Sequence, residues 1–246
     1  MSEPIVFIHG LFHMLGGLHP EPCFAPRTVL TPDLPGFGRN RDVRDVSVPA
    51  AAEHVREAIL SAGFERAHIA GHSVGGAVAV LLANRYPKLV LSFINIEGNF
   101  TLKDAFWSGK LARMDPAEAD ALIESYRADP AGWLARNGIE PTPERTALAF
   151  EGLTAQPTST VQAMARSVVA ITEQPGYLDQ VRQILDRGTP IHLVAGERSR
   201  TGWDVPDFVL ARAASMTVQP RVGHLMMLEN APEFFRIVAG LLPKDD

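Results

Sequence analysis

Short apolar runs alternate with longer amphipathic stretches along this chain. The apolar runs lie at residues 5–8, 28–31, 68–70, 90–96, 191–195 and 216–218, and they predict strands buried on both faces. The stretches between them, at residues 50–62, 74–84, 207–214 and 232–241, place apolar side chains at helical spacing. Strands that alternate with helices favour a parallel sheet with right-handed crossovers. The pattern therefore predicts an α/β fold, with a mostly parallel sheet of about six strands flanked by helices.

Residues 99–188 break this alternation. They hold no convincing strand, and prolines separate predicted helices at residues 104–114, 116–126, 143–153, 159–170 and 177–186. Such a segment is too long for one ordinary crossover connection. We therefore expect an α/β core formed by residues 1–98 and 189–246, and a helical insertion formed by residues 99–188. The alternative is that these helices are connections that lie on the surface of the sheet.

Composition and charge narrow the classes of protein that this chain can belong to. Its 246 residues are 46% hydrophobic, which suits one α/β domain with an insertion. The net charge of −5 argues against nucleic acid or an anionic membrane as a partner. Cys23 is the one cysteine, so an internal disulfide is excluded and no paired thiols suggest a metal site. Without a signal-peptide pattern or a bilayer-length apolar run, we expect a cytoplasmic protein.

The stretch Gly71-His72-Ser73-Val74-Gly75-Gly76 carries the strongest chemical signal. A predicted strand precedes this G-x-S-x-G sequence and a predicted helix follows it, which is the setting of a nucleophile elbow. The sharp turn strains the backbone of the serine, so its neighbours must be small, and the glycines meet that need. The hydroxyl would then lie above a helix N-terminus, which favours developing negative charge. The alternative is a glycine-rich turn without chemistry.

Two further segments fit a serine-based site. His9-Gly10-Leu11 follows the first predicted strand, and such a turn can direct a backbone N–H toward an oxyanion. Gly223-His224 follows the last predicted strand, where a histidine can serve as the base of an upstream serine. Asp33-Leu34-Pro35-Gly36-Phe37-Gly38 forms a third turn motif, after the second predicted strand.

With these segments, in this order, the chain resembles the α/β-hydrolase superfamily from Ile5 to about Leu242. The resemblance implies the α/β-hydrolase fold, with a helical cap inserted between the sixth and seventh strands of the family, where residues 99–188 stand. It also implies that Ser73 is the nucleophile, that His224 is the general base, and that the backbone N–H groups of Leu11 and Val74 form the oxyanion hole.

The acid of the triad departs from the common family pattern. Most relatives carry it three residues after a glycine that ends the seventh strand, but here that position holds Ser199. A minority of relatives, including haloalkane dehalogenases and some lactonases, use an acid at the end of the sixth strand, where this chain has Glu97. A glutamate directly after a buried strand is costly unless it is paired or functional. We therefore expect Glu97 to be the acid, and the remaining candidates, which follow the seventh strand, are Glu197, Asp204 and Asp207.

These residues imply a serine hydrolase that cleaves a small or medium apolar ester, thioester or lactone through an acyl-serine, with no metal or organic cofactor. Related alternatives are a C–C bond hydrolase and a perhydrolase. The C–C bond hydrolase is less favoured, because that branch of the superfamily often has asparagine beside the nucleophile and tryptophan after the histidine, where this chain has His72 and Leu225. A slow-turnover ligand receptor and an inactive interaction protein are alternatives of other classes. The expected partner is a small molecule, and the choice between monomer and homodimer stays open.

Several other side chains are candidates for contacts with the substrate. His13 and His19 follow the first turn, which borders the pocket in relatives. The predicted cap contributes aromatic residues that either line an apolar pocket or form the core of the cap, namely Phe106, Trp107, Trp133 and Phe150.

Overall fold

Parallel strands form the centre of the fold. In the computed structural model, which describes residues 2–13, 15 and 17–243, six strands pair in the order β2-β1-β3-β4-β5-β6. Every pairing between neighbours is parallel. The outermost residues of the predicted core, 1 and 244–246, lie outside the described residues. The strands are β1 (Ile5–Ile8), β2 (Val29–Leu30), β3 (Ala67–His72), β4 (Val90–Ile96), β5 (Ile191–Gly196) and β6 (Ser215–Gln219).

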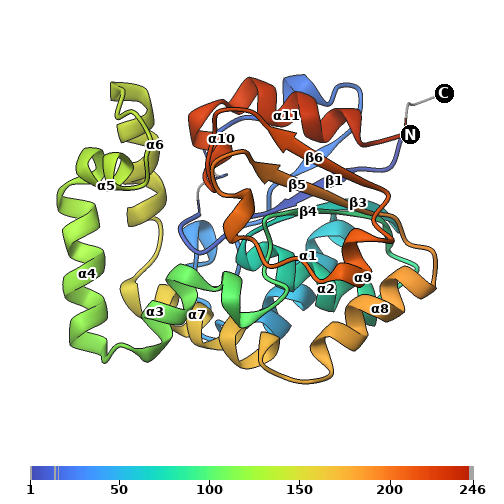
Figure 1. Ribbon diagram of the computed structural model, residues 1–246, viewed down its shortest axis with the longest axis horizontal. Helices are drawn as coiled ribbons and strands as arrows, with labels where there is room; N and C mark the ends of the chain where they lie inside the picture. The colour runs from blue at the N-terminus through green and yellow to red at the C-terminus, as the bar shows by residue number, and fades with distance from the viewer. Residues whose placement is uncertain (1, 14, 16, 244–246) are drawn as a thin grey trace.

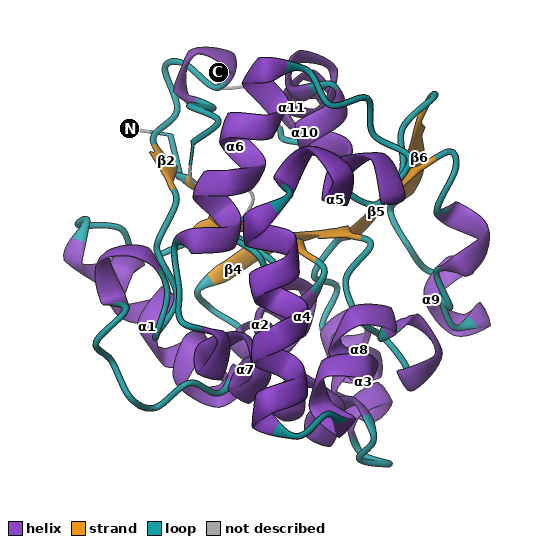
Figure 2. Cartoon of the chain, turned by 90° about the vertical axis from the view of Figure 1, so that its left-hand side faces the viewer, coloured by secondary structure: helices purple, strands orange, loops and turns teal. Residues whose placement is uncertain are grey.

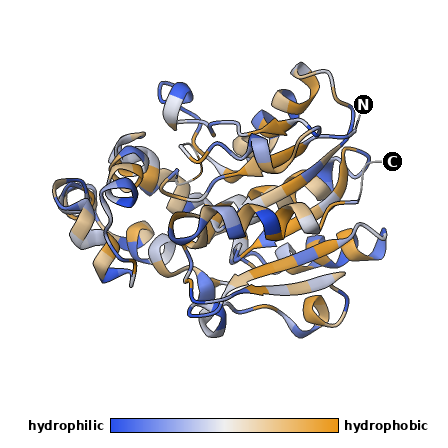
Figure 3. Ribbon diagram, turned by 90° about the horizontal axis from the view of Figure 1, so that it is seen from above, coloured by the Kyte–Doolittle hydropathy of each residue, from blue (hydrophilic) through white to orange (hydrophobic). Residues whose placement is uncertain are grey.

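Helices cover both faces of this sheet, which explains why its strands are apolar on both sides. In Figure 1, α1 (Val48–Ser61), α2 (Val74–Arg85) and α8 (Tyr177–Asp186) lie below the sheet, and α11 (Ala231–Gly240) lies above it. Every residue of β1 and β3 is buried. Most of the strand ribbon in Figure 3 has the orange, hydrophobic colour.

A group of helices interrupts the core between β4 and β5. These inserted helices are α3 (Phe106–Arg113), α4 (Pro116–Ala128), α5 (Pro130–Arg136), α6 (Pro143–Thr154) and α7 (Thr158–Thr172). Proline opens α4, α5 and α6, where its missing N–H has no helical partner to lose. Figure 1 shows α4, α5 and α6 as a separate group at the left, and Figure 2 shows them in front of the sheet. Because β1 runs leftward from the N-terminus, the carboxyl ends of the parallel strands point toward this group.

Some predicted elements differ from the observed ones. Two observed helices, α5 and α10 (Met226–Glu229), lie outside the predicted helices. The predicted helix at 207–214 is only α9 (Asp207–Leu210). The predicted helix at 104–114 is divided by Ala105, whose ψ of 49° is not helical. Short 3₁₀ turns complete the described structure, namely η1 (Glu21–Cys23), η2 (Gly38–Asn40), η3 (Leu102–Asp104) and η4 (Arg200–Gly202).

The described residues contain neither a membrane-crossing helix nor a cluster of metal ligands. Across residues 2–13, 15 and 17–243, each helix is too short or too polar to span a bilayer. In the same residues, no three histidine, cysteine, aspartate or glutamate side chains converge as the ligands of a metal ion would. Cys23 is a free, exposed thiol.

Candidate active site

Ser73 occupies the turn between β3 and α2. Its φ of 54° and ψ of −121° place a non-glycine residue in a sparsely populated backbone region, which is the geometry of a nucleophile elbow. The backbone holds this turn, since Ser73 N donates to Ile96 O at 3.1 Å and Ser73 O accepts from Gly76 N at 2.8 Å. A Cβ on Gly71 or Gly75 would clash with nearby backbone, so the small neighbours of Ser73 are required by space.

Gly76 provides a direct test of this close packing. A Cβ on Gly76 would lie 2.5 Å from the Cα of Gly98, and neither backbone can move without disturbing Ser73 or Glu97. We expect Gly76→Ala to lower the free energy of unfolding by about 1–3 kcal/mol, measured by urea denaturation. Gly176→Ala is the control, because a Cβ there meets nothing within 4 Å. Equal stability of the two variants would contradict the expected clash.

His224 and Glu97 form a close pair at the carboxyl edge of the sheet. His224 follows β6, Glu97 follows β4, and Nδ1 of His224 lies 2.7 Å from Oε2 of Glu97. Because an ionised carboxylate only accepts hydrogen bonds, Nδ1 carries the proton and Nε2 is left as an acceptor. The other oxygen of Glu97 accepts from Gly196 N at 2.9 Å and from Ser199 Oγ at 2.6 Å. These donors compensate for the burial of a side chain that is only 3% exposed.

Ser199 has a role that the sequence did not reveal. It stands where most relatives carry the acid, and here its hydroxyl donates to the acid on the neighbouring strand instead. The carboxylates that remained as alternatives to Glu97 lie elsewhere. Glu197 accepts from Arg221 N at 2.7 Å, Asp204 accepts from Thr101 Oγ1 at 2.7 Å, and Asp207 is exposed at the start of α9. The geometry therefore favours Glu97 as the partner of His224.

The predicted oxyanion donors flank Ser73. Val74 is the first residue of α2, where backbone N–H groups lack partners within the helix. Leu11 is buried and lines the same pocket as Ser73 and His224. Gly10 lets this turn approach closely, because a Cβ on Gly10 would lie 3.1 Å from the Cβ of Ser73. Leu11 therefore lines the pocket that holds Ser73, and Val74 follows Ser73 directly in the chain.

His72 contacts the loop that carries His224. Its Nε2 donates to the carbonyl oxygen of His224 at 3.0 Å, and the two rings lie 4.7 Å apart. Burial, and then the neighbouring His224, hold the pKa of His72 well below its usual value. Burial likewise lowers the pKa of His9 to about 3. Both side chains are therefore neutral at physiological pH, and His72 helps to fix the backbone at His224.

A pocket of about 440 Å³ opens above Ser73. Aromatic rings and polar groups share its wall, since it is lined by Phe106, Trp107 and Trp203 and by Asn99, Asp104, Asn137 and Arg198, beside the residues already described. The remaining candidates lie apart from it. His13 donates to Asp33 at 2.6 Å, His19 and Phe150 are exposed, and Trp133 is buried among the inserted helices.

Asp104 contributes a partly buried carboxyl to the pocket. Burial raises its pKa to about 6, although Phe100 N and the Asn99 amide donate to it at 3.2 Å. Because the folded-state pKa exceeds the unfolded value, folding becomes less favourable as the pH rises from about 4 through 6. We expect Asp104→Asn to stabilise the protein by about 1–2 kcal/mol at pH 8 and to lose this advantage at pH 4.

Thermal unfolding at both pH values measures the effect of Asp104. The exposed Asp120 on α4 is the control, and Asp120→Asn should leave the pH dependence unchanged. An Asp104→Asn variant whose stability parallels the wild type at every pH would contradict the raised pKa.

Known proteins share sequence similarity with parts of this chain. The chain is 36% identical over 125 residues to an uncharacterised protein of Mycobacterium tuberculosis, an alignment that covers 48% of this chain and 36% of that protein. It is 25% identical over 239 residues to the dihydrolipoyllysine-residue acetyltransferase component of the acetoin cleaving system of Cupriavidus necator, covering 95% of this chain and 62% of that protein. The chain thus spans about a third to three fifths of the length of these relatives.

One solved structure and one family model each cover nearly all of this chain. A carboxylesterase structure from Nitrososphaera gargenis superposes with a TM-score of 0.74 at 16% identity, covering 97% of this chain and 89% of that one, which is a likeness of fold. The model of the alpha/beta hydrolase family matches residues 5–237, which include the elbow, Glu97 and His224. The chain therefore belongs to the alpha/beta hydrolase family.

Proposed function

We propose that this protein is a serine hydrolase that cleaves a small or medium carboxylic ester, thioester or lactone. The observation that carries the proposal is the 2.7 Å contact between His224 Nδ1 and Glu97 Oε2, with His224 and Ser73 lining one pocket. A buried carboxylate that fixes the tautomer of a histidine beside an elbow serine suits nucleophilic acyl transfer.

In the proposed cycle, Nε2 of His224 takes the proton of Ser73 as the hydroxyl attacks the carbonyl carbon. The tetrahedral oxyanion accepts hydrogen bonds from the backbone N–H groups of Leu11 and Val74. His224 then donates the proton to the leaving oxygen or sulfur, and an acyl-serine forms. Water attacks the acyl carbon with His224 again as the base, which releases the acid and restores Ser73. Glu97 stays ionised throughout and stabilises the imidazolium.

The pocket supports the proposed class of substrate. Its volume of about 440 Å³ lies within the usual range for small-molecule ligands. The exposed ring of Phe106 and the indole of Trp107, which lies 5.9 Å from the His224 ring, offer apolar contacts for an acyl or alcohol group. We propose that the inserted helices act as a cap, because α3 brings these rings over Ser73.

Reaction with a fluorophosphonate, followed by peptide mapping, tests the proposal. We expect fast, stoichiometric labelling of Ser73, and hydrolysis of esters, thioesters or lactones from a panel of increasing acyl length. Folded protein that neither labels at Ser73 nor turns over any member of the panel would reject the hydrolase function. Labelling of Ser73 with turnover slower than about one per hour would instead favour a slow-turnover ligand receptor, since enzymes typically turn over 1–10³ times per second.

A further inference from the structure

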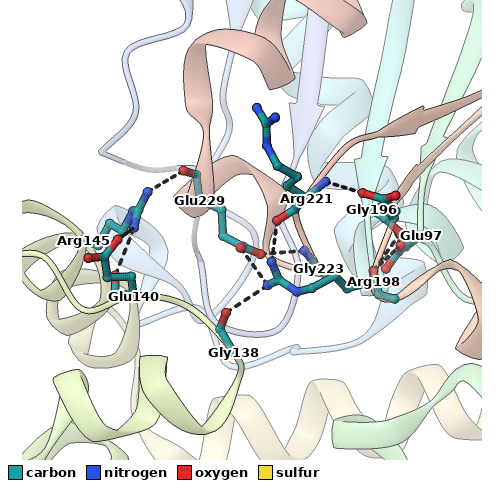
Figure 4. Close-up of polar contacts among 11 residues, drawn as sticks. Glu97, Gly138, Glu140, Arg145, Gly196, Arg198, Arg221, Gly223 and Glu229 are labelled. Carbon is teal, nitrogen blue, oxygen red and sulfur yellow. Dashed lines mark hydrogen bonds and ion pairs between the residues drawn. The ribbon is translucent and has the colours of Figure 1, made fainter.

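A second carboxylate lies beside the loop that carries His224. Glu229 ends α10, five residues after His224, and its side chain is only 9% exposed. One oxygen, Oε1, accepts from the backbone N of Gly223 at 2.6 Å. The other, Oε2, lies 2.7 Å from NH2 of Arg198. Figure 4 shows Glu229 in contact with both Arg198 and Gly223, so this carboxylate holds the residue directly before His224.

Arg198 connects this carboxylate to the loop that holds Glu97. It lies between Gly196, the last residue of β5, and Ser199, and both of these residues donate to Glu97. Its guanidinium also donates to the carbonyl oxygen of Arg221, on the same loop as His224. The Glu229–Arg198 pair therefore binds the loop of His224 to the segment that donates to Glu97 (Figure 4).

The inserted helices join the same network from the other side. Nη2 of Arg198 donates to the backbone oxygen of Gly138 at 3.0 Å, and Nη2 of Arg145 donates to the backbone oxygen of Glu229 at 2.7 Å. Gly138 follows α5 and Arg145 lies in the first turn of α6. Both contacts thus come from the junction of two inserted helices, and both end on Glu229 or on its ion-pair partner.

This arrangement bears on catalysis because His224 must hold Nε2 within hydrogen-bond reach of Ser73. Glu97 holds the imidazole of His224, and His72 holds the backbone carbonyl of His224. Glu229 holds the backbone N–H of the preceding residue, Gly223. Displacing a reacting group by about 1 Å can lower a rate about 10²-fold. The loop between Arg221 and Leu225 has no regular structure of its own, so these side-chain contacts set its position.

We propose, taking the hydrolase function above as given, that Glu229 is a positioning residue for His224. Its carboxylate clamps the backbone of the histidine loop to the acid loop through Arg198. Because Gly138 and Arg145 form hydrogen bonds with this clamp, the position of the inserted helices on the core and the orientation of His224 depend on each other.

Glu229→Gln tests the clamp with little change of shape. The amide oxygen can still accept from Gly223 N, but the amide nitrogen would face the NH2 donor of Arg198. We expect kcat for ester hydrolysis and the rate of Ser73 labelling to fall about 10–100-fold, with KM changed less than about twofold. Arg198→Lys keeps the charge but not the fork that reaches Arg221 and Gly138, and should show a smaller loss of the same kind.

Glu233→Gln is the matched control. Glu233 lies on the neighbouring helix α11 and pairs with Arg236, without a part in the network around His224. This variant should keep the wild-type kcat, KM and labelling rate. A fall in kcat equal to that of Glu229→Gln would mean that any carboxylate lost from this region has the same effect, and would overturn the positioning role.

A measurement without substrate separates this proposal from the proposed function. In protein with ¹⁵N-labelled histidine, the Nδ1 proton that His224 donates to Glu97 should give a downfield resonance, identified by its absence in His224→Gln. We expect this resonance to shift or to exchange faster in Glu229→Gln and to stay unchanged in Glu233→Gln. If the resonances of the two variants follow this pattern but the wild-type protein does not label at Ser73, the hydrolase function is rejected and the clamp is retained.

Two results would overturn the clamp. One is an unchanged His224 resonance in folded Glu229→Gln. The other is a loss of activity that follows the melting temperature alone and disappears when the assay is run well below it. Should Glu229→Gln fail to fold, Arg198→Lys decides by the same resonance, since Arg198 also lines the pocket and its replacement can change KM directly.

Discussion

Ser73→Ala is expected to lower kcat for ester hydrolysis by about 10⁶-fold and to abolish labelling by a fluorophosphonate. The variant removes the hydroxyl oxygen that would form the proposed acyl intermediate, while the pocket and the proposed backbone donors at Leu11 and Val74 stay in place. KM for slowly hydrolysed esters should therefore change little. Steady-state kinetics with active-site titration of the wild type measures the loss.

Stability measurements separate the chemical effect of this change from a structural one. Alanine has the same backbone preference as serine, so Ser73→Ala should keep the strained φ of 54° and unfold at nearly the wild-type temperature. Ser73→Gly should relieve the strain and stabilise the fold by about 1 kcal/mol, even though it too removes the nucleophile. A folded Ser73→Ala variant that retains turnover would reject Ser73 as the nucleophile.

The sequence predicted the sheet well because its strands are short, apolar and separated by helices. The observed bounds of β1 and β4 are the predicted ones, and all six strands lie within a few residues of their predicted positions. The edge strand β2 is shorter than predicted, covering only Val29–Leu30. Pro32 follows closely and lacks an N–H to donate, so pairing with β1 does not extend further.

Short helices were harder to predict than strands. Asp129 caps α5 and Pro130 opens it, as Asp115 and Pro116 do for α4 and as Thr142 and Pro143 do for α6. The seven residues of α5 complete only two turns and include Gly132, so no apolar period could emerge. The four residues of α10 are buried almost throughout, and a periodicity of burial does not exist over one turn. Tertiary packing, rather than local helix propensity, determines where α5 and α10 form.

Some parts of the candidate site are local sequence motifs, and others are contacts between residues that are far apart in the sequence. The elbow, the His9-Gly10 turn and the Gly223-His224 pair are local motifs, so their positions could be predicted from neighbouring residues. The bond from Ser199 to Glu97 joins residues 102 apart, and the bond from His72 to His224 joins residues 152 apart. No local pattern encodes these contacts, which arise only when parallel strands bring their carboxyl ends to one edge.

Glu97→Gln is expected to lower kcat by about 10⁴-fold while leaving the protein folded. The amide oxygen can still accept from Gly196 N and Ser199 Oγ, which hold the side chain in place. The amide nitrogen would then face Nδ1 of His224 and donate to it, so the proton of the imidazole would move to Nε2. A histidine in that tautomer has no lone pair toward Ser73 and cannot accept its proton.

The remaining carboxylates supply the controls for Glu97. Glu197→Gln, Asp204→Asn and Asp207→Asn should each change kcat less than about threefold, because such surface changes leave the His224 contact intact. Steady-state kinetics across the pH range compares all four variants, and the melting temperature of Glu97→Gln shows that it is folded. If Asp204→Asn were the variant that lost activity, the acid would lie after β5, as in most relatives. The bond from Glu97 to His224 would then be structural, and Ser199 would support a carboxylate with no part in the chemistry.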